Sequence, residues 1–306
     1  MAATPQEQTF TAYTPSQGKA YAEGRRDYHP NLYRTIMEKH TTTGSQLTTL
    51  LDVGCGPGLA TRALASHFEK AIGLDPSAGM IAAARSLPNP NSIRYEISSA
   101  EELGRDLDPP IQSGSVDLIT AATCAHWFDM PRFWPRAAQI LKPGGSVAIW
   151  TPGLMRIHPS VPNHVAIQKA VDDHEKEYME PYFAPGNFMV KNLYRDLILP
   201  WDLEVPEEVF DEKTLFRKEW DWTEDDGVDS EKPPITMGMV EKLLETASPV
   251  TRWKEAHPEL VGTEKDAVKV IIAEIKRLLH EVGVEEGKEF IKGVLGGVLL
   301  VVKKKV

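Results

Sequence analysis

The chain has 306 residues, of which 42% are hydrophobic and 25% are charged. This is the composition of an ordinary globular protein, and it excludes collagen-like, disordered and coiled-coil chains. The charged side chains sum to −10, and an acidic surplus of this kind repels phosphate backbones. We therefore expect no nucleic-acid partner, and a small molecule as the ligand.

Residues 1–49 are polar and compatible with helices that are interrupted at Pro15 and Pro30. From residue 49 to Trp150, short apolar segments alternate with helical patterns. We predict strands over 49–53, 71–75, 93–97, 116–121 and 146–150, and helices over 59–68, 76–85 and 133–141. This alternation indicates a parallel sheet with helices on both faces, because crossover connections are right-handed.

The alternation ends after Trp150, and residues 151–215 are rich in proline and aromatic residues. They predict an inserted helical cap. Two further strands (215–220 and 297–303) and two helices (235–245 and 264–282) return the chain to the sheet. The expected fold is α/β, a Rossmann-like, doubly wound, mostly parallel seven-stranded sheet with an inserted helical cap. We expect a helical lid (1–45), a cofactor-binding core (46–150), a cap insertion with one returning strand (151–260), and a C-terminal helix and strand completing the sheet (261–306).

The two cysteines, Cys55 and Cys124, are too few for a disulfide scaffold. No paired-ligand spacing surrounds either one, so we expect no metal. The first ten residues lack the apolar run of a signal peptide. The longest apolar stretch, 294–302, is far short of the ~20 residues of a membrane helix. We expect a cytoplasmic protein without a membrane partner, either a monomer or a dimer.

The first chemical signal is the glycine-rich turn of residues 54–58 (Gly-Cys-Gly-Pro-Gly), between a predicted strand and a predicted helix. Glycines let the backbone approach a ligand closely, and a helix N-terminus favours negative charge. The turn departs from the G-x-G-x-x-G dinucleotide pattern, and a tight structural turn is the alternative. Asp75 ends the next strand, where a carboxylate can accept both ribose hydroxyls or cap the following helix. The two roles are compatible.

Four motifs in this order give the chain a specific resemblance to class I S-adenosylmethionine-dependent methyltransferases: residues 51–58, 73–77, 99–103 and 141–145. The resemblance implies that the glycine turn contacts the methionine part of the cofactor, that Asp75 holds the ribose and that residues near Ala100 border the adenine. Met80 is either an adenine-packing residue or ordinary helix core. The implied cofactor-binding residues are Asp52, Gly54, Cys55, Gly56, Gly58, Asp75, Pro76, Ser77, Met80, Ser99, Ala100, Glu101, Ala122 and Thr123.

Residues 120–128, with Phe133 and Trp134, resemble the trans-aconitate methyltransferase subgroup, which includes fungal small-molecule carboxyl methyltransferases. Residues 181–186 and 250–253 match that subgroup more loosely. An N-terminal strip also matches it through Tyr21, Arg25, Tyr28 and Leu32, although Arg26 and His29 stand where the subgroup has prolines. The implied substrate-binding residues are Tyr21, Arg25, Tyr28, His126, Trp127 and Phe183.

Methyl transfer needs alignment of nucleophile, carbon and sulfur and the exclusion of water. A carboxylate acceptor is already ionised and needs a cationic holder, for which Arg25 and Arg26 are candidates. An alcohol or phenol needs a base, and His126 is the candidate catalytic residue. The alternatives are that His126 only shapes the wall, that Trp127 is core and that Arg26 pairs with surface carboxylates.

We therefore expect an S-adenosylmethionine-dependent methyltransferase that forms S-adenosylhomocysteine. The expected reaction is O-methylation of a small carboxylic acid in secondary metabolism. The alternatives are S-, N- or phenol O-methylation of a small metabolite, or a non-catalytic cofactor-binding protein of the same fold.

Overall fold

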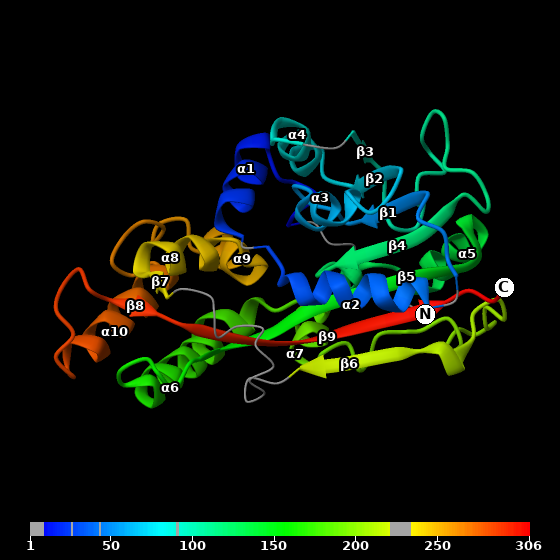
Figure 1. The fold of residues 1–306 in the computed structure, drawn as a ribbon. Helices are drawn as coiled ribbons and strands as arrows, with labels where there is room; N and C mark the ends of the chain where they lie inside the picture. Colours follow the sequence, from blue (N-terminus) through cyan, green and yellow to red (C-terminus); the bar gives the residue numbers. More distant parts are fainter. Residues whose placement is uncertain (1–8, 26, 43, 90–91, 221–233) are drawn as a thin grey trace.

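The computed structural model describes residues 9–25, 27–42, 44–89, 92–220 and 234–306 (Figure 1). Its main sheet has seven strands in the order β3-β2-β1-β4-β5-β9-β6. Their bounds are β1 (Thr49–Val53), β2 (Lys70–Asp75), β3 (Ile93–Ile97), β4 (Val116–Ala122), β5 (Leu141–Ile157), β6 (Phe216–Trp220) and β9 (Gly293–Lys303). The strands from β3 to β5 pair in parallel, and β9 is antiparallel to both of its neighbours. The predicted mostly parallel, Rossmann-like seven-stranded sheet is confirmed.

Two strands are longer than the sequence predicts. β5 continues past Trp150 to Ile157, and β9 already begins at Gly293, so that the two pair along most of their length. A register shift between Pro152 and Met155 interrupts the ladder. Proline has no N–H for a ladder and is tolerated at such irregularities, which explains how the strand continues through Pro152.

Helices cover both faces of the sheet. α2 (Pro30–Thr41) and α3 (Leu59–Ala65) pack on one face, around Leu50 and Trp150. α5 (Met130–Ile140) and the segment after α7 (Pro185–Lys191) cover the other face around Phe133, Trp134 and Tyr194. α4 (Ala78–Ser86) packs beside β2 and β3. Pro15 and Pro30, where the sequence indicated interruptions, are the first residues of α1 and α2, a position where proline fits.

The cap lies at one end of the sheet (Figure 1). It contains α6 (His164–His174), a π-helical turn (Glu175–Met179), a 3₁₀ turn (Glu180–Tyr182), α8 (Met237–Glu245), α9 (Ser248–Ala256), α10 (Ala267–His280) and the ribbon of β7 (Ile235–Thr236) and β8 (Phe290–Ile291). α10 packs on α6 and α8 around Ile271 and Ile275. The C-terminal helix therefore shares its core with the cap, and only β9 returns to the sheet.

α1 (Pro15–Gly24) touches both α4 and α8 (Figure 1). A Cβ atom added to Gly18 would lie 2.6 Å from the Gly79 carbonyl oxygen, and one added to Gly79 would lie 2.0 Å from the Tyr13 carbonyl oxygen. The two glycines thus allow a backbone-to-backbone contact that no side chain would fit. At its other end, Gly24 lies against Thr246 at the end of α8. α1 is therefore held to the sheet domain and to the cap. In the described parts of the chain, no helix combines the length and apolar character needed to cross a membrane.

Candidate active site

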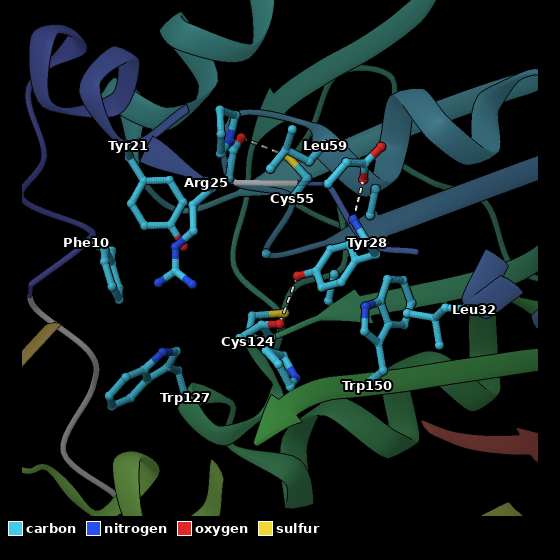
Figure 2. Close-up of a pocket in the computed structure, with 18 of the residues that line it drawn as sticks. Phe10, Tyr21, Arg25, Tyr28, Leu32, Cys55, Leu59, Cys124, Trp127 and Trp150 are labelled. Atoms are coloured by element: carbon cyan, nitrogen blue, oxygen red, sulfur yellow. Dashed lines mark hydrogen bonds between the residues drawn. The ribbon is translucent and has the colours of Figure 1, made fainter. Parts of the chain in front are cut away.

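A cavity of about 340 Å³ opens at the carboxyl ends of the parallel strands. Its floor comes from the turns after β1, β2 and β4 and from β5, and the N-terminal segment covers it. Figure 2 shows Phe10, Tyr21 and Arg25 on one side and Tyr28, Leu32 and Trp150 on the other. Ligands of open α/β sheets bind at this edge.

The glycine turn after β1 forms part of this wall, and its three glycines all have positive φ angles (63°, 53° and 82°). A Cβ on Gly54 would lie 2.7 Å from the Cys124 sulfur, and one on Gly58 would lie 2.3 Å from the Tyr95 hydroxyl. A Cβ on Gly56 would meet no atom within 4 Å. Packing therefore demands glycine at two positions, whereas Gly56 opens toward the cavity. Cys55 also lines it.

Asp75 ends β2 on the cavity wall and is buried. One carboxylate oxygen accepts a hydrogen bond from the Gly56 N–H at 2.9 Å and the other accepts one from the Ser77 N–H at 2.8 Å. Burial raises the pKa of Asp75 to about 6. A carboxylate oxygen has a second lone-pair site, so Asp75 can hold the turn and the start of α4 and still accept from ligand hydroxyls.

The predicted adenine side of the site lies beyond Asp75. Pro76, Met80, Ser99, Ala100 and Glu101 all line the cavity. A Glu101 carboxylate oxygen accepts from the Asp129 N–H at 3.0 Å, which ties this wall to the segment after β4. Ser77 is not among the lining residues. Its hydroxyl accepts from the Met80 N–H at 3.3 Å and caps α4.

Asp52 does not line the cavity. Its side chain is completely buried and accepts hydrogen bonds from the Thr61 hydroxyl at 2.5 Å and the Thr120 hydroxyl at 2.7 Å. Burial raises its pKa to about 6. Asp52 therefore joins β1, α3 and β4 behind the glycine turn, and its carboxylate has no path to a ligand in this arrangement.

The segment after β4 forms the floor beneath the N-terminal residues. Ala122, Thr123 and Trp127 line the cavity. Thr123 has a φ angle of 56°, a strained conformation for a β-branched residue of the kind that clusters at functional sites. Its hydroxyl is hydrogen-bonded to the Tyr28 hydroxyl at 2.8 Å, as the dashed line in Figure 2 marks. Next to it, the Cys124 thiol donates to the Val53 carbonyl oxygen at 3.1 Å.

His126 lies behind this floor, in the 3₁₀ turn Ala125–Trp127. The ring is buried and is not part of the cavity wall. Its Nδ1 lies 2.7 Å from the Tyr194 hydroxyl. Burial, together with the nearby Arg25, lowers the pKa of His126 to about 3. The neighbouring Trp127 faces the cavity in its place.

Arg25 follows α1 and has a guanidinium 5.0 Å from the centre of the Tyr21 ring. Nη2 donates to the Thr246 carbonyl oxygen at 3.4 Å, and the buried Nε has no hydrogen-bond partner among the described residues. In Figure 2 the guanidinium lies between Phe10 and Trp127. An unpaired buried donor is costly, so a ligand oxygen would satisfy it. The other candidate, Arg26, lies outside the described residues.

Phe183 is not in this cavity but lines a second one, of about 250 Å³, inside the cap. Its ring packs edge-on against Phe188. In the described ranges of the chain, no group of three His, Cys, Asp or Glu side chains has the geometry of a metal site.

Several lining residues were not among the predicted ones, including Phe10, Leu32 and Trp150. Trp150 could have been found, because it ends the predicted strand 146–150 and the carboxyl edge of the sheet is the expected ligand site. Leu32 belongs to the N-terminal strip that matches the subgroup and could have been included with Tyr28. Phe10 carries no sequence signal that separates it from packing residues.

Comparison with known proteins gives three findings. The profile of a family described as a methyltransferase domain matches residues 51–149. A Dictyostelium discoideum protein that carries the provisional name of a methyltransferase is 36% identical over 186 residues, which is 60% of this chain and 64% of that protein. The trans-aconitate 2-methyltransferase of Deinococcus radiodurans is 32% identical over 137 residues, which is 41% of this chain and 49% of that enzyme. The chain thus spans less than two thirds of these curated relatives.

One solved structure agrees over nearly the whole chain. It comes from Anaeromyxobacter dehalogenans and is provisionally named a type II methyltransferase. It is 25% identical, covers 92% of this chain and 97% of its own, and has a TM-score of 0.58. The agreement therefore includes the cap as well as the sheet.

Proposed function

Because residues 51–149 match a methyltransferase domain and the fold is shared with a methyltransferase structure, we infer that the chain is an S-adenosylmethionine-dependent methyltransferase of the class I fold. We propose that its acceptor is a small molecule with a free carboxylate. The cytoplasmic location predicted from the sequence is part of this proposal.

The residues at the strand ends fit the cofactor. Gly56 leaves open space where a side chain would project, and Asp75 has acceptor sites for the ribose hydroxyls. Residues 54–58 carry no lysine or arginine, which suits a cofactor without phosphate. Ser99, Ala100 and Glu101 would border the adenine. When bound, S-adenosylmethionine supplies an electrophilic methyl group on a sulfonium.

The proposal of a carboxylate acceptor rests on the side chains that face the position of methyl transfer. Burial raises the pKa of the Tyr28 phenol and of the Cys124 thiol, and Thr123 and Trp127 have no proton-accepting group for this purpose. None of these four residues is a base at neutral pH. A carboxylate needs none, because it is already ionised. Arg25, with its unpaired Nε, offers the charged donor that would hold it.

In this proposal the residues of the chain hold and align the acceptor. Arg25 binds one carboxylate oxygen and leaves the other free to attack, and Tyr21 keeps the guanidinium in place through its ring. Tyr28 and Thr123 fix the floor, and Trp127 and Phe10 exclude water. No proton is transferred, and His126 acts only by positioning Trp127. The name of the trans-aconitate enzyme among the relatives supports a carboxylate acceptor.

One observation favours a different acceptor. His29 also lines the cavity, where its Nδ1 accepts from the Asn31 N–H at 3.1 Å and caps α2. Because Nδ1 accepts this bond, the neutral ring carries its proton on Nε2, which can donate to the oxygen of a phenol or alcohol. Phenol methylation is therefore the second candidate.

The experiment uses S-adenosylmethionine labelled in the methyl group and a panel of carboxylic acids, phenols and thiols. A methyl ester releases labelled methanol in alkali, whereas an ether or thioether keeps the label. Alkali-labile label on an acid is the expected result. Alkali-stable label on a phenol would favour the second candidate, a phenol oriented by His29. Absence of S-adenosylhomocysteine binding in calorimetry would refute the cofactor assignment.

The role of Arg25 is tested with Arg25→Lys, which keeps the charge but removes the guanidinium and its Nε–H donor. We expect the KM for the acid to rise roughly 10–150-fold, since a hydrogen bond to a charged group contributes about 1.5–3 kcal/mol. The affinity for S-adenosylhomocysteine should not change. Arg34→Ala, on the exposed side of α2, is the matched control. Weaker binding of S-adenosylhomocysteine with an unchanged KM for the acid would indicate that Arg25 contacts the carboxylate of the cofactor instead.

A further inference from the structure

The second cavity, of about 250 Å³, lies inside the cap and has no part in the proposed methyl transfer. Its wall is largely aliphatic. Three cap helices supply much of it: Val171 of α6, Val240 and Leu244 of α8, and Ile271 and Ile275 of α10. Such an apolar space near an active site suits the hydrocarbon part of a ligand.

The four polar residues that line this cavity, His174, Glu175, Asn187 and Lys191, already have partners. The His174 ring lies 2.8 Å from the carbonyl oxygen of the first residue of α10, and Lys191 donates to Glu175 at 2.8 Å. The Asn187 side-chain oxygen accepts from an arginine of α9 at 2.6 Å. Burial also lowers the pKa of His174, so the ring is uncharged at pH 7. A ligand here would therefore gain by burying apolar surface.

The two cavities adjoin each other. Met155 and Ile291 line both of them, so the spaces lie on either side of these two side chains. Met155 is five residues beyond Trp150 on β5, which is about 17 Å of strand. A methionine side chain adapts its shape easily, and Gly293 leaves room for it, because a Cβ there would lie 2.5 Å from its sulfur. A long ligand can thus pass from one cavity to the other when Met155 turns aside.

We propose that the second cavity holds the aliphatic chain of the methyl acceptor, so that the substrate is a carboxylic acid with a long unbranched hydrocarbon tail. The carboxylate lies near Arg25 and Thr123, and the chain runs along β5, past Met155, and ends among α6, α8 and α10. This rests on the proposed function for the reacting end, and on the apolar wall and the shared residues for the tail.

The test compares butanoic, octanoic, dodecanoic and hexadecanoic acids as acceptors and as ligands. Each methylene that enters the second cavity should improve binding by about fourfold, the factor that corresponds to about 0.8 kcal/mol. We expect KM to fall steeply once the chain is long enough to pass Met155. Val171→Phe fills the second cavity and should cancel that fall, with the KM for butanoic acid unchanged. Leu244→Phe fills the same space from α8 and guards against a folding defect in the first variant.

The matched control is Val165→Phe, the same substitution on the same helix at a residue that is 71% exposed and outside the cavity. It should retain the chain-length effect. A KM that does not depend on chain length, or that responds equally to Val165→Phe and Val171→Phe, would overturn the proposal.

Calorimetry separates failure of this proposal from failure of the proposed function. Binding of the same acids is measured with S-adenosylhomocysteine present. If no acid is methylated but hexadecanoic acid binds and Val171→Phe abolishes the binding, the tail site stands and the carboxyl transfer does not. If acids are methylated but binding is independent of chain length in both proteins, the tail site is wrong and the reaction stands.

Discussion

The replacement Asp75→Asn tests the cofactor site most directly. The substitution keeps the size of the side chain but removes the charge that would accept from the ribose. A hydrogen bond to a charged group contributes about 1.5–3 kcal/mol, which corresponds to roughly 10–150-fold in Kd. We therefore expect the Kd for S-adenosylhomocysteine, measured by calorimetry at pH 7, to rise by this factor.

The pH dependence of the same residue gives a second test. The folded pKa of Asp75 is about 6, above its ordinary value of 3.8, because the carboxyl is buried. Its contribution to stability is therefore fully present below pH 3.8 and is lost as the pH rises through about 6. The difference corresponds to about 3 kcal/mol at 1.36 kcal/mol per pH unit. Between pH 3.8 and about 6, the free energy of unfolding in urea should therefore fall for the wild-type chain relative to Asp75→Asn.

Cofactor affinity should change in the opposite direction, because ribose hydroxyls stabilise the ionised carboxylate. The wild-type Kd for S-adenosylhomocysteine should rise as the pH falls below about 6, and the Kd of Asp75→Asn should not. Asp52→Asn is the matched control, since Asp52 is also buried with a pKa of about 6 but does not line the cavity. Its affinity at pH 7 should match wild type. Unchanged affinity in Asp75→Asn, or an equal loss in Asp52→Asn, would refute the reasoning.

Further predictions concern the glycine turn and the floor of the site. Gly56→Ala places a methyl group in the cavity and should weaken S-adenosylhomocysteine roughly tenfold in calorimetry, with about 1 kcal/mol lost in thermal unfolding. In Gly58→Ala the added methyl group would collide with the Tyr95 hydroxyl, and the free energy of unfolding should fall by about 1–3 kcal/mol. His126→Gln should leave the pH–rate profile between pH 5 and 8 unchanged, because the wild-type ring is uncharged there. Since the folded pKa of His126 is lowered to about 3, its stabilising contribution is lost between pH 6.5 and 3, and His126→Gln should resist acid unfolding better. Tyr194→Phe removes the partner of that ring and should cost about 1 kcal/mol in urea unfolding.

The sheet could be predicted from the sequence because its strands are short apolar segments separated by helical patterns. All seven predicted strands overlap observed ones. The extension of β5 beyond Trp150 could not be predicted, since Pro152 and Gly153 read as a turn, and only pairing with β9 keeps that segment extended. The packing of α10 within the cap could not be predicted either. Its apolar face indicates that the helix packs against another part of the chain, but it does not identify α6 and α8 as the partners.

The site residues show a similar division. Motif position places a residue at the sheet edge, and most predicted residues there do line the cavity. Motif position does not show in which direction a side chain points. All five residues of β1 are buried, so no alternation reveals that Asp52 faces the threonines rather than a ligand. In the 3₁₀ turn, the rings of His126 and Trp127 have centroids only 4.5 Å apart, yet Trp127 alone of the two lines the cavity.

The contact of Gly18 with Gly79 has a kinetic consequence. α1 is fixed to the sheet domain there and to the cap near Thr246, and its end supplies Tyr21 and Arg25 to the cavity wall. A displacement of the cap that admits one molecule therefore disturbs the wall against which the other molecule rests. Under the proposed function, the acceptor rests against Tyr21 and Arg25, so its exchange is coupled to the position of α1 and the cap. Under the proposed function we therefore predict an ordered sequence of binding and release, in which the methylated product departs before S-adenosylhomocysteine.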